Sequence, residues 1–208
     1  MFEVFMFVNP IGTCCYQTEQ TIMKTMKEAK IATRYQLIPL ANMHTIQSDL
    51  IRKHLCPSNL TIFNHASEAT FTALKTYHAI KMAYGNKKAR AFCLRLQHAI
   101  NELNQPYSLT LVLNLFAELK LDASKVQAAE ASPYLKESIA ADEKLAQKWH
   151  IRDTPTTVIF NDEDETSGLI IEGLLPYDEL VQIINGENDF TSLSASMIEL
   201  HPNKLRLL

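Results

Sequence analysis

The amino-acid sequence predicts an α/β fold in which a small mixed sheet is interrupted by an all-helical insertion. Three observations lead to this prediction. The first 40 residues read as strand, helix and strand; the apolar residues then keep a helical period over about 44–150; and two strands with a closing helix follow. The predicted order is therefore β-α-β, several helices, and β-β-α.

Residues 2–8 are apolar apart from Glu3, as expected for a strand that is buried on both faces. A helix is predicted over 13–30 and a second strand over 34–40. A unit of this kind has parallel strands joined by a right-handed crossover. These elements, with residues 1–43 and 151–187, are predicted to form one domain.

The inserted domain is predicted to span 44–150. Gly85 stands where a C′ glycine ends a helix, and Asn86 is a candidate cap for the next helix. Pro106 stops that second helix, and Asp122 can cap a later short one. The predicted helices cover about 67–84, 86–103 and 109–119, a short stretch after Asp122, and 133–149 with Pro133 at the first position.

Residues 156–160 and 169–172 are predicted to pair as a hairpin across the acidic turn 161–167, and a helix over 176–185 closes the domain. The pattern assigns no element to the tail, residues 188–208.

Composition excludes several classes of function. The chain of 208 residues has a formal net charge of −3, which argues against nucleic acid or an anionic membrane as a partner. The N-terminus lacks the basic region of a signal peptide, and no apolar stretch approaches the roughly 18 residues of a membrane span. We expect a soluble cytoplasmic protein without cofactor or metal. His54, Cys56 and His65 do not have the spacing of a structural zinc site, and Cys93 is expected in the core.

The run Val-Phe-Met-Phe-Val-Asn-Pro over 4–10, the helix start that follows, and Thr154-Pro155-Thr156 before a strand resemble the DsbA family. That family has a thioredoxin fold with an inserted helical domain, and the resemblance covers roughly 2–186. The stretch 161–165 and Tyr177-Asp178 are most similar to its cytosolic YjbH/SpxH-type branch. The resemblance implies a protein that presents an Spx-type regulator to the ClpXP protease.

One departure from the family pattern matters. The family carries Pro-x-Cys-x-x-Cys, whereas this chain has Gly12 at the first cysteine position and Cys15 at the second. A thiolate is stabilised at the start of a helix, which is where Gly12 would lie. Cys14 could be a reactive single thiol, or both cysteines could be small apolar fillers. Cys14 and Cys15 are too close in the chain to bridge each other easily.

The resemblance also implies a cis peptide bond before Pro155 and a backbone at Thr154 that pairs with an extended segment. The alternative is that this loop only shapes the fold.

Three functions remain open. The first is a protein-binding adaptor that uses Gly12, Thr13, Thr154 and Pro155. The second is a weak or monothiol oxidoreductase that uses Cys14 or Cys15, and the third is a glutathione-dependent isomerase. An efficient dithiol enzyme is not expected, because resolution of a mixed disulfide needs two thiols within reach.

Overall fold

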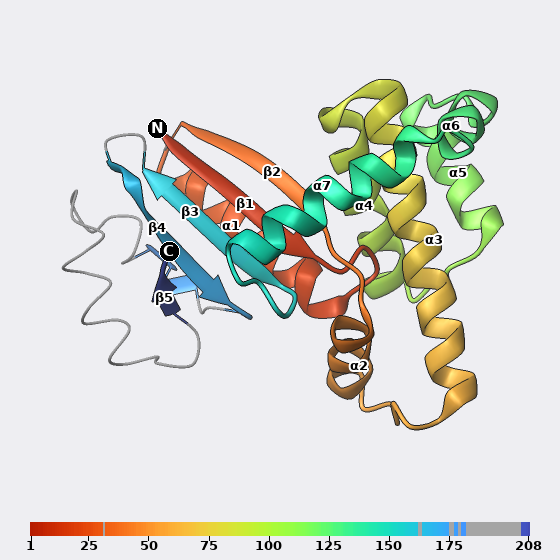
Figure 1. The fold of residues 1–208 in the computed structure, drawn as a ribbon, viewed down its shortest axis with the longest axis horizontal. Helices are drawn as coiled ribbons and strands as arrows, with labels where there is room; N and C mark the ends of the chain where they lie inside the picture. The colour runs from red at the N-terminus through yellow and green to blue at the C-terminus, as the bar shows by residue number, and fades with distance from the viewer. Residues whose placement is uncertain (31, 162–163, 175–176, 179, 182–204) are drawn as a thin grey trace.

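The computed structural model describes residues 1–30, 32–161, 164–174, 177–178, 180–181 and 205–208. A five-stranded sheet has the order β2-β1-β3-β4-β5 (Figure 1). β1 and β2 are parallel, as predicted, and the other neighbouring pairs are antiparallel. The strands are β1 (Phe2–Val8), β2 (Thr33–Pro39), β3 (Thr156–Asn161), β4 (Asp164–Glu172) and β5 (Leu205–Leu207).

One helix, α1 (Thr13–Glu28), connects β1 to β2, and six helices lie between β2 and β3. No strand occurs between residues 43 and 148, so the predicted thioredoxin-type order with a helical insertion is confirmed. The six are α2 (Met43–Arg52), α3 (Leu60–Tyr84), α4 (Asn86–Asn101), α5 (Leu109–Leu119), α6 (Ala123–Glu130) and α7 (Tyr134–Lys148). Figure 1 shows most of this insertion beside one end of the sheet, with α7 running back across it.

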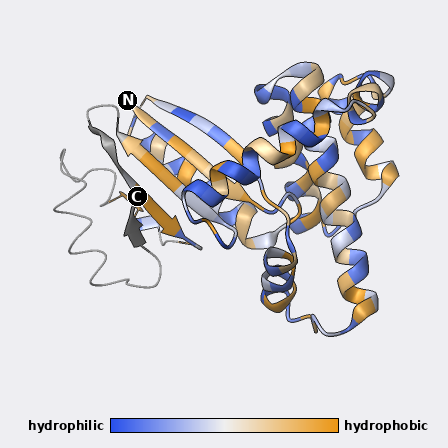
Figure 2. Ribbon diagram, viewed as in Figure 1, coloured by the Kyte–Doolittle hydropathy of each residue, from blue (hydrophilic) through white to orange (hydrophobic). Residues whose placement is uncertain are grey.

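The central strand β1 is buried on both faces, because its side chains alternate between two hydrophobic clusters. Val4, Met6 and Val8 of β1 join the cluster that includes α1, α3 and α4. Phe5 and Phe7 point the other way and pack with residues from the end of α7 and beyond, including Trp149. The central strand β1 is accordingly hydrophobic apart from Glu3 (Figure 2). This double burial explains why residues 4–8 are all apolar.

Several predicted boundaries need correction. α2 was not predicted, and α3 begins at Leu60 rather than near residue 67, because the Asn59 side chain caps it. Asn86 is not a cap: it is the first residue of α4, and Gly85 precedes it as the capping residue. Asp122 does cap α6, as predicted, by accepting a hydrogen bond from the Ser124 N–H at 2.9 Å.

The C-terminal predictions fall largely outside the described residues. Of the predicted closing helix 176–185, residues 177–178 and 180–181 are described and are helical. Of the tail 188–208, residues 205–208 are described, and β5 pairs there with β4. Among the helices that the structure describes, none is both long enough and apolar enough to cross a membrane.

Candidate functional site

The turn between β1 and α1 is held by hydrogen bonds within the chain. The Asn9 side chain accepts a bond from the Ile11 N–H at 3.0 Å, and the Asn9 carbonyl accepts one from the Gly12 N–H at 3.0 Å. The Gln97 side chain of α4 donates to the same carbonyl at 3.2 Å. Asn9 is 1% exposed, and these three hydrogen bonds satisfy its side-chain oxygen and its carbonyl in the absence of solvent. The turn is therefore rigidly placed at the start of α1.

Cys15 lies beneath this turn and is 2% exposed. Its Sγ accepts a hydrogen bond from the Asn9 N–H at 3.2 Å. Burial raises the pKa of the Cys15 thiol far above its ordinary value, and this effect outweighs the Asn9 bond that favours the thiolate. The thiol is thus neutral and shielded, which is the opposite of an activated nucleophile.

Gly12, which the resemblance predicts to stand at the first cysteine position of the family pattern, directly precedes α1. Its φ of −78° and ψ of 136° are open to any residue. A Cβ placed there would lie 3.1 Å from Cys15 Sγ and 3.0 Å from Asn9 Cβ. In a disulfide, each sulfur lies about 3.0 Å from the other cysteine's Cβ, given an S–S bond of about 2.05 Å. A cysteine side chain built at position 12 would therefore start within reach of Cys15 Sγ, although its contact with Asn9 Cβ would be tight.

The α2 helix supplies a carboxylate to the start of α1. Asp49 Oδ1 accepts a hydrogen bond from the Thr13 N–H at 3.3 Å, and Asp49 Oδ2 lies 2.7 Å from Lys53 Nζ. The first N–H groups of a helix attract negative charge, and here a buried carboxylate of the chain itself fills that role. Asp49 also contributes to the raised pKa of Cys15.

A second residue of α2, Arg52, holds the loop before β3. The Thr154–Pro155 peptide bond is cis. Arg52 donates one hydrogen bond to the Thr154 carbonyl and another to Asp153 Oδ2, the latter at 2.7 Å. The Thr154 N–H donates to Asp153 Oδ1 at 2.8 Å. Both backbone groups of Thr154 are therefore bonded within the chain, and Thr154 and Pro155 are buried.

The structure brings Gly12, Cys15 and Thr154 together, since the Thr154 side chain also influences the pKa of Cys15. Thr13 and Cys14 lie on the half-exposed side of the first turn of α1, away from this buried group. Cys14 is thus the only one of the two neighbouring cysteines with partial access to solvent. Asp49 and Arg52 were not predicted. The Asn42 and Thr45 pair, which forms a capping box at the start of α2, was the signal that could have located them.

Glu19 is a further buried residue that the sequence did not single out. It lies one turn after Cys15 on α1, is 0% exposed, and its carboxylate oxygens have no hydrogen-bond partner among the described residues. Burial raises the pKa of Glu19 to about 8, although the nearby Gln97 side chain opposes this shift. The carboxyl is consequently largely protonated at neutral pH.

An apolar groove of about 390 Å³ opens beside the turn. Asn9 and Ile11 of the turn, Leu50 of α2 and Ile62 of α3 line it, with Leu55 in the connection between the two helices. Leu55 is 41% exposed, so part of this apolar lining faces solvent. The groove therefore connects the turn between β1 and α1 to the inserted helices α2 and α3.

The remaining cysteines lie apart from this site. Cys93 is buried in the core, as predicted, and its pKa is raised by burial. Cys56 is exposed, and hydrogen bonds from the Ser58 side chain and from the backbone after it lower its pKa. In the part of the chain that the structure describes, no three His, Cys, Asp or Glu residues are grouped so that they could hold a metal ion.

Comparison with known proteins identifies this architecture. The family model described as Thioredoxin matches residues 5–182. The ClpXP adapter protein SpxH of Staphylococcus saprophyticus is 26% identical over 185 residues, which cover 88% of this chain and 64% of that protein. The chain thus spans slightly less than two thirds of the length of this relative.

Solved structures agree with the fold. The probable DsbA oxidoreductase SCO1869 of Streptomyces coelicolor is similar with a TM-score of 0.63 at 13% identity, over 91% of this chain and 92% of that one. The cytosolic disulfide reductase DsbM of Pseudomonas aeruginosa has a TM-score of 0.53 at 17% identity, over 95% and 99%. These likenesses establish a DsbA-like fold.

Proposed function

The chain belongs to the thioredoxin family, and from this premise we propose that it is a cytoplasmic protein-binding adaptor of the Spx and ClpXP type rather than a dithiol oxidoreductase. The observation that carries the proposal is the state of Cys15. The one thiol that maps onto a family cysteine is buried, bonded to the Asn9 N–H, and has a strongly raised pKa. Cys15 is therefore not poised as a nucleophile, while the scaffold around it is kept.

The name of the relative supports the direction of the proposal. A ClpXP adapter acts by binding a protein, and a relative with that name is similar over 88% of this chain. Residue identity of 26% supports a shared mode of action and leaves the partner of this chain to be identified by experiment. An Spx-type regulator is the partner that we propose to test first.

The geometry changes where the partner should bind. The expected pairing with the backbone of Thr154 would require the partner to displace Arg52 and the Asp153 carboxylate. We therefore propose that the partner contacts the half-exposed Thr13 and Cys14 beside Gly12 and the apolar groove at Leu55. A few residues in well-packed, desolvated pockets near the centre of an interface contribute most of its affinity.

The test is a titration of the chain with an Spx-type regulator, followed by a degradation assay with ClpXP. Leu55→Asp should weaken binding by at least about tenfold, because it places a charge in the groove. Leu113→Asp is a matched control: Leu113 is 44% exposed against 41% for Leu55, and it lies on α5 outside this groove. Equal effects of the two substitutions would refute the proposed surface.

A double substitution separates the adaptor from the monothiol enzyme. Replacement of Cys14 and Cys15 by Ser removes both thiols of the motif and should leave binding and delivery largely unchanged. If the regulator is captured only by the wild type, and if that capture is reversed by a reducing agent, the function is thiol exchange through Cys14 rather than adaptor binding.

A further inference from the structure

The buried acid Glu19 lies near a side chain whose orientation is fixed. Gln97 of α4 is 0% exposed, and its Nε2 donates to the Asn9 carbonyl at 3.2 Å. A carbonyl oxygen can only accept a hydrogen bond, so the amide nitrogen of Gln97 must be the atom that faces Asn9. The Oε1 atom of Gln97 consequently lies on the other side of the amide, buried and without a hydrogen-bond partner among the described residues.

Three buried acceptor atoms are therefore left without a donor on α1 and α4. They are Gln97 Oε1 and both carboxyl oxygens of Glu19, within the part of the chain that the structure describes. The Gln97 side chain is close enough to Glu19 to influence the pKa of its carboxyl. An ionised Glu19 would offer acceptors only, whereas a protonated Glu19 supplies one O–H donor. A single proton on Glu19 thus meets a need of both side chains.

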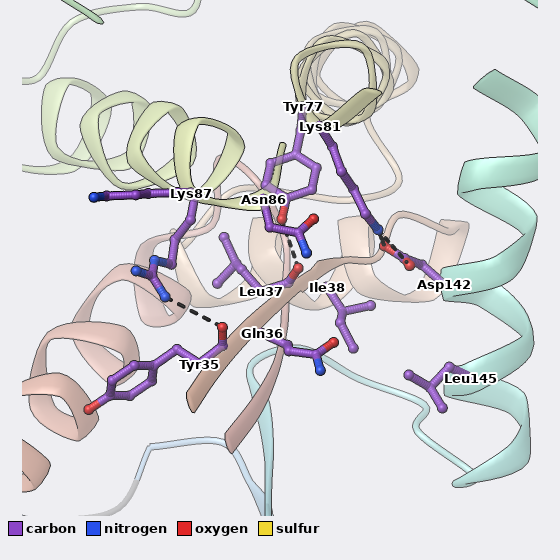
Figure 3. A pocket seen from close by; sticks show the side chains of 11 residues that line it. Tyr35, Gln36, Leu37, Ile38, Tyr77, Lys81, Asn86, Lys87, Asp142 and Leu145 are labelled. Carbon is purple, nitrogen blue, oxygen red and sulfur yellow. Dashed lines mark hydrogen bonds and ion pairs between the residues drawn. The ribbon is translucent and has the colours of Figure 1, made fainter. Parts of the chain in front are cut away.

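The titratable groups around Glu19 do not supply a compensating positive charge. Glu19 influences two thiols and two phenols, and burial raises the pKa of each, so that they stay neutral; they are Cys15, Tyr16, Cys93 and Tyr77. The Tyr77 hydroxyl is engaged elsewhere, because it donates to the Leu37 carbonyl at 2.8 Å (Figure 3). Arg90, the cation that acts on Tyr77, donates to the Tyr35 carbonyl at 3.4 Å.

From this arrangement we propose that Glu19 and Gln97 form a proton-controlled latch that holds the turn before α1. In the protonated state, the Glu19 hydroxyl donates to Gln97 Oε1, and the Gln97 amide nitrogen remains bonded to the Asn9 carbonyl. Loss of the proton to solvent leaves a buried carboxylate, and the Gln97 amide then turns its nitrogen toward that charge. The same rotation brings Oε1 against the Asn9 carbonyl, so the bond from α4 to the turn is lost.

The turn connects this latch to the groove at Leu55. The Asn9 carbonyl also accepts the Gly12 N–H at 3.0 Å, and Asn9 and Ile11 line the groove. Loss of the bond from Gln97 at alkaline pH should loosen this wall of the groove and weaken binding of the partner. The effect on the partner rests on the function proposed above, whereas the latch itself can be tested without a partner.

The experiment is an NMR titration of the full chain between about pH 4 and pH 10, with Cys14→Ser present so that this neighbouring thiol does not titrate. The carboxyl carbon of Glu19 reports its proton, and the Gly12 amide reports the turn. Both signals should change with one common midpoint near pH 8. A carboxyl midpoint near the ordinary 4.5 overturns the protonated state, and a Gly12 amide that does not follow the carboxyl overturns the latch.

Two variants and a control make the test specific. Glu19→Gln keeps a permanent donor for Gln97 Oε1, so its Gly12 amide should not shift between pH 6 and pH 10. Gln97→Met removes the amide, so its Gly12 signal at neutral pH should already lie near the alkaline position of the wild type. Glu68→Gln, at an exposed glutamate of α3, should titrate as the wild type does. A Gly12 shift that persists in Glu19→Gln assigns the titration to another group and overturns the latch. Circular dichroism confirms that each variant is folded.

Titration with an Spx-type regulator tests the consequence for binding. Affinity should be at least about threefold weaker at pH 9 than at pH 7 in the wild type and equal at both values in Glu19→Gln, because the variant cannot lose this proton. An equal loss in both proteins overturns the control of the groove by Glu19. Absence of binding at either pH refutes the proposed function instead, and the NMR titration then decides on the latch alone.

Discussion

The helices α1 and α4 both begin directly after a glycine that gives no side-chain cap, and their surroundings differ in sign. The start of α1 receives the Asp49 carboxylate from α2, and a second acid, Glu19, lies buried along the same helix. The start of α4 opens on a cleft lined by Lys87 and Arg90. The unpaired N–H groups of a helix start attract an anion, so the source of that anion distinguishes the two regions.

The two helix starts differ in whether a carboxylate of the chain itself accepts one of their first N–H groups. At the start of α1, the Asp49 carboxylate accepts the Thr13 N–H. A negative charge of the chain itself thus lies where a thiolate would otherwise be stabilised. At α4 no side-chain hydrogen bond caps the first turn, and that turn contains no acidic residue. Four predictions test this comparison.

The largest effect is expected from Gly12→Cys. A Cβ at position 12 lies 3.1 Å from Cys15 Sγ, so the new thiol should form a disulfide with Cys15 in mild oxidant. Disulfide reductase activity should rise by at least about a hundredfold, because the second thiol is held beside the first. Mass spectrometry and an insulin-reduction assay measure the two results. Replacement of Asp49 by Asn in this variant should increase the rate further, and a decrease would show that Asp49 does not oppose the thiolate.

Glu19→Gln should change how stability depends on pH. The carboxyl has a pKa of about 8 in the folded chain against an ordinary value of 4.5, so the folded state binds more protons between these values. Wild-type stability therefore falls as pH rises from about 4.5 to about 8. Relative to wild type, Glu19→Gln should gain about 2–4 kcal/mol between pH 5 and pH 8. Urea unfolding at both pH values provides the measurement, with the exposed Glu68→Gln as a control that should not alter the slope.

Asp49→Asn should destabilise the chain by about 1–2 kcal/mol, because the Thr13 N–H and Lys53 lose their charged partner. Glu118→Gln is the control: Glu118 pairs with Arg95 at the surface, where an ion pair contributes at most about 1 kcal/mol. Thermal unfolding near neutral pH gives both values. A loss in Asp49→Asn no larger than that in the control would mean that the start of α1 does not depend on the carboxylate.

The smallest effect is expected at α4. Asn86→Asp places an acid in the first turn and should stabilise the chain by about 0.3–1 kcal/mol. Asn101→Asp, at the last residue of α4, should have the opposite sign because it faces the negative end of the helix. Chemical denaturation can resolve the pair. If both substitutions act with the same sign, the start of α4 is not electropositive.

Most of the sheet and the helical insertion could be predicted because their signals are local. The apolar run of β1, the hairpin of β3 and β4, and the cap at Asp122 are all contained in a few neighbouring residues. The surroundings of Gly12 could not be predicted, since α2 is short and its partners are remote. Asp49 is 36 residues from Thr13, and Arg52 is 101 residues from Asp153. No periodic pattern encodes such contacts.

The hydrogen bonds of Tyr77 and Arg90 to β2 have one more consequence. An edge strand normally offers unpaired backbone groups to strands of other molecules, and this is a common route to aggregation. At β2, two side chains of the inserted helices occupy the Tyr35 and Leu37 carbonyls. A copy of the chain could extend the sheet at this edge only after the helical layer had separated from it. The inserted helices thus prevent β2 from pairing with a strand of another molecule. Intermolecular strand pairing at β2 would therefore indicate that the helices have separated from the sheet.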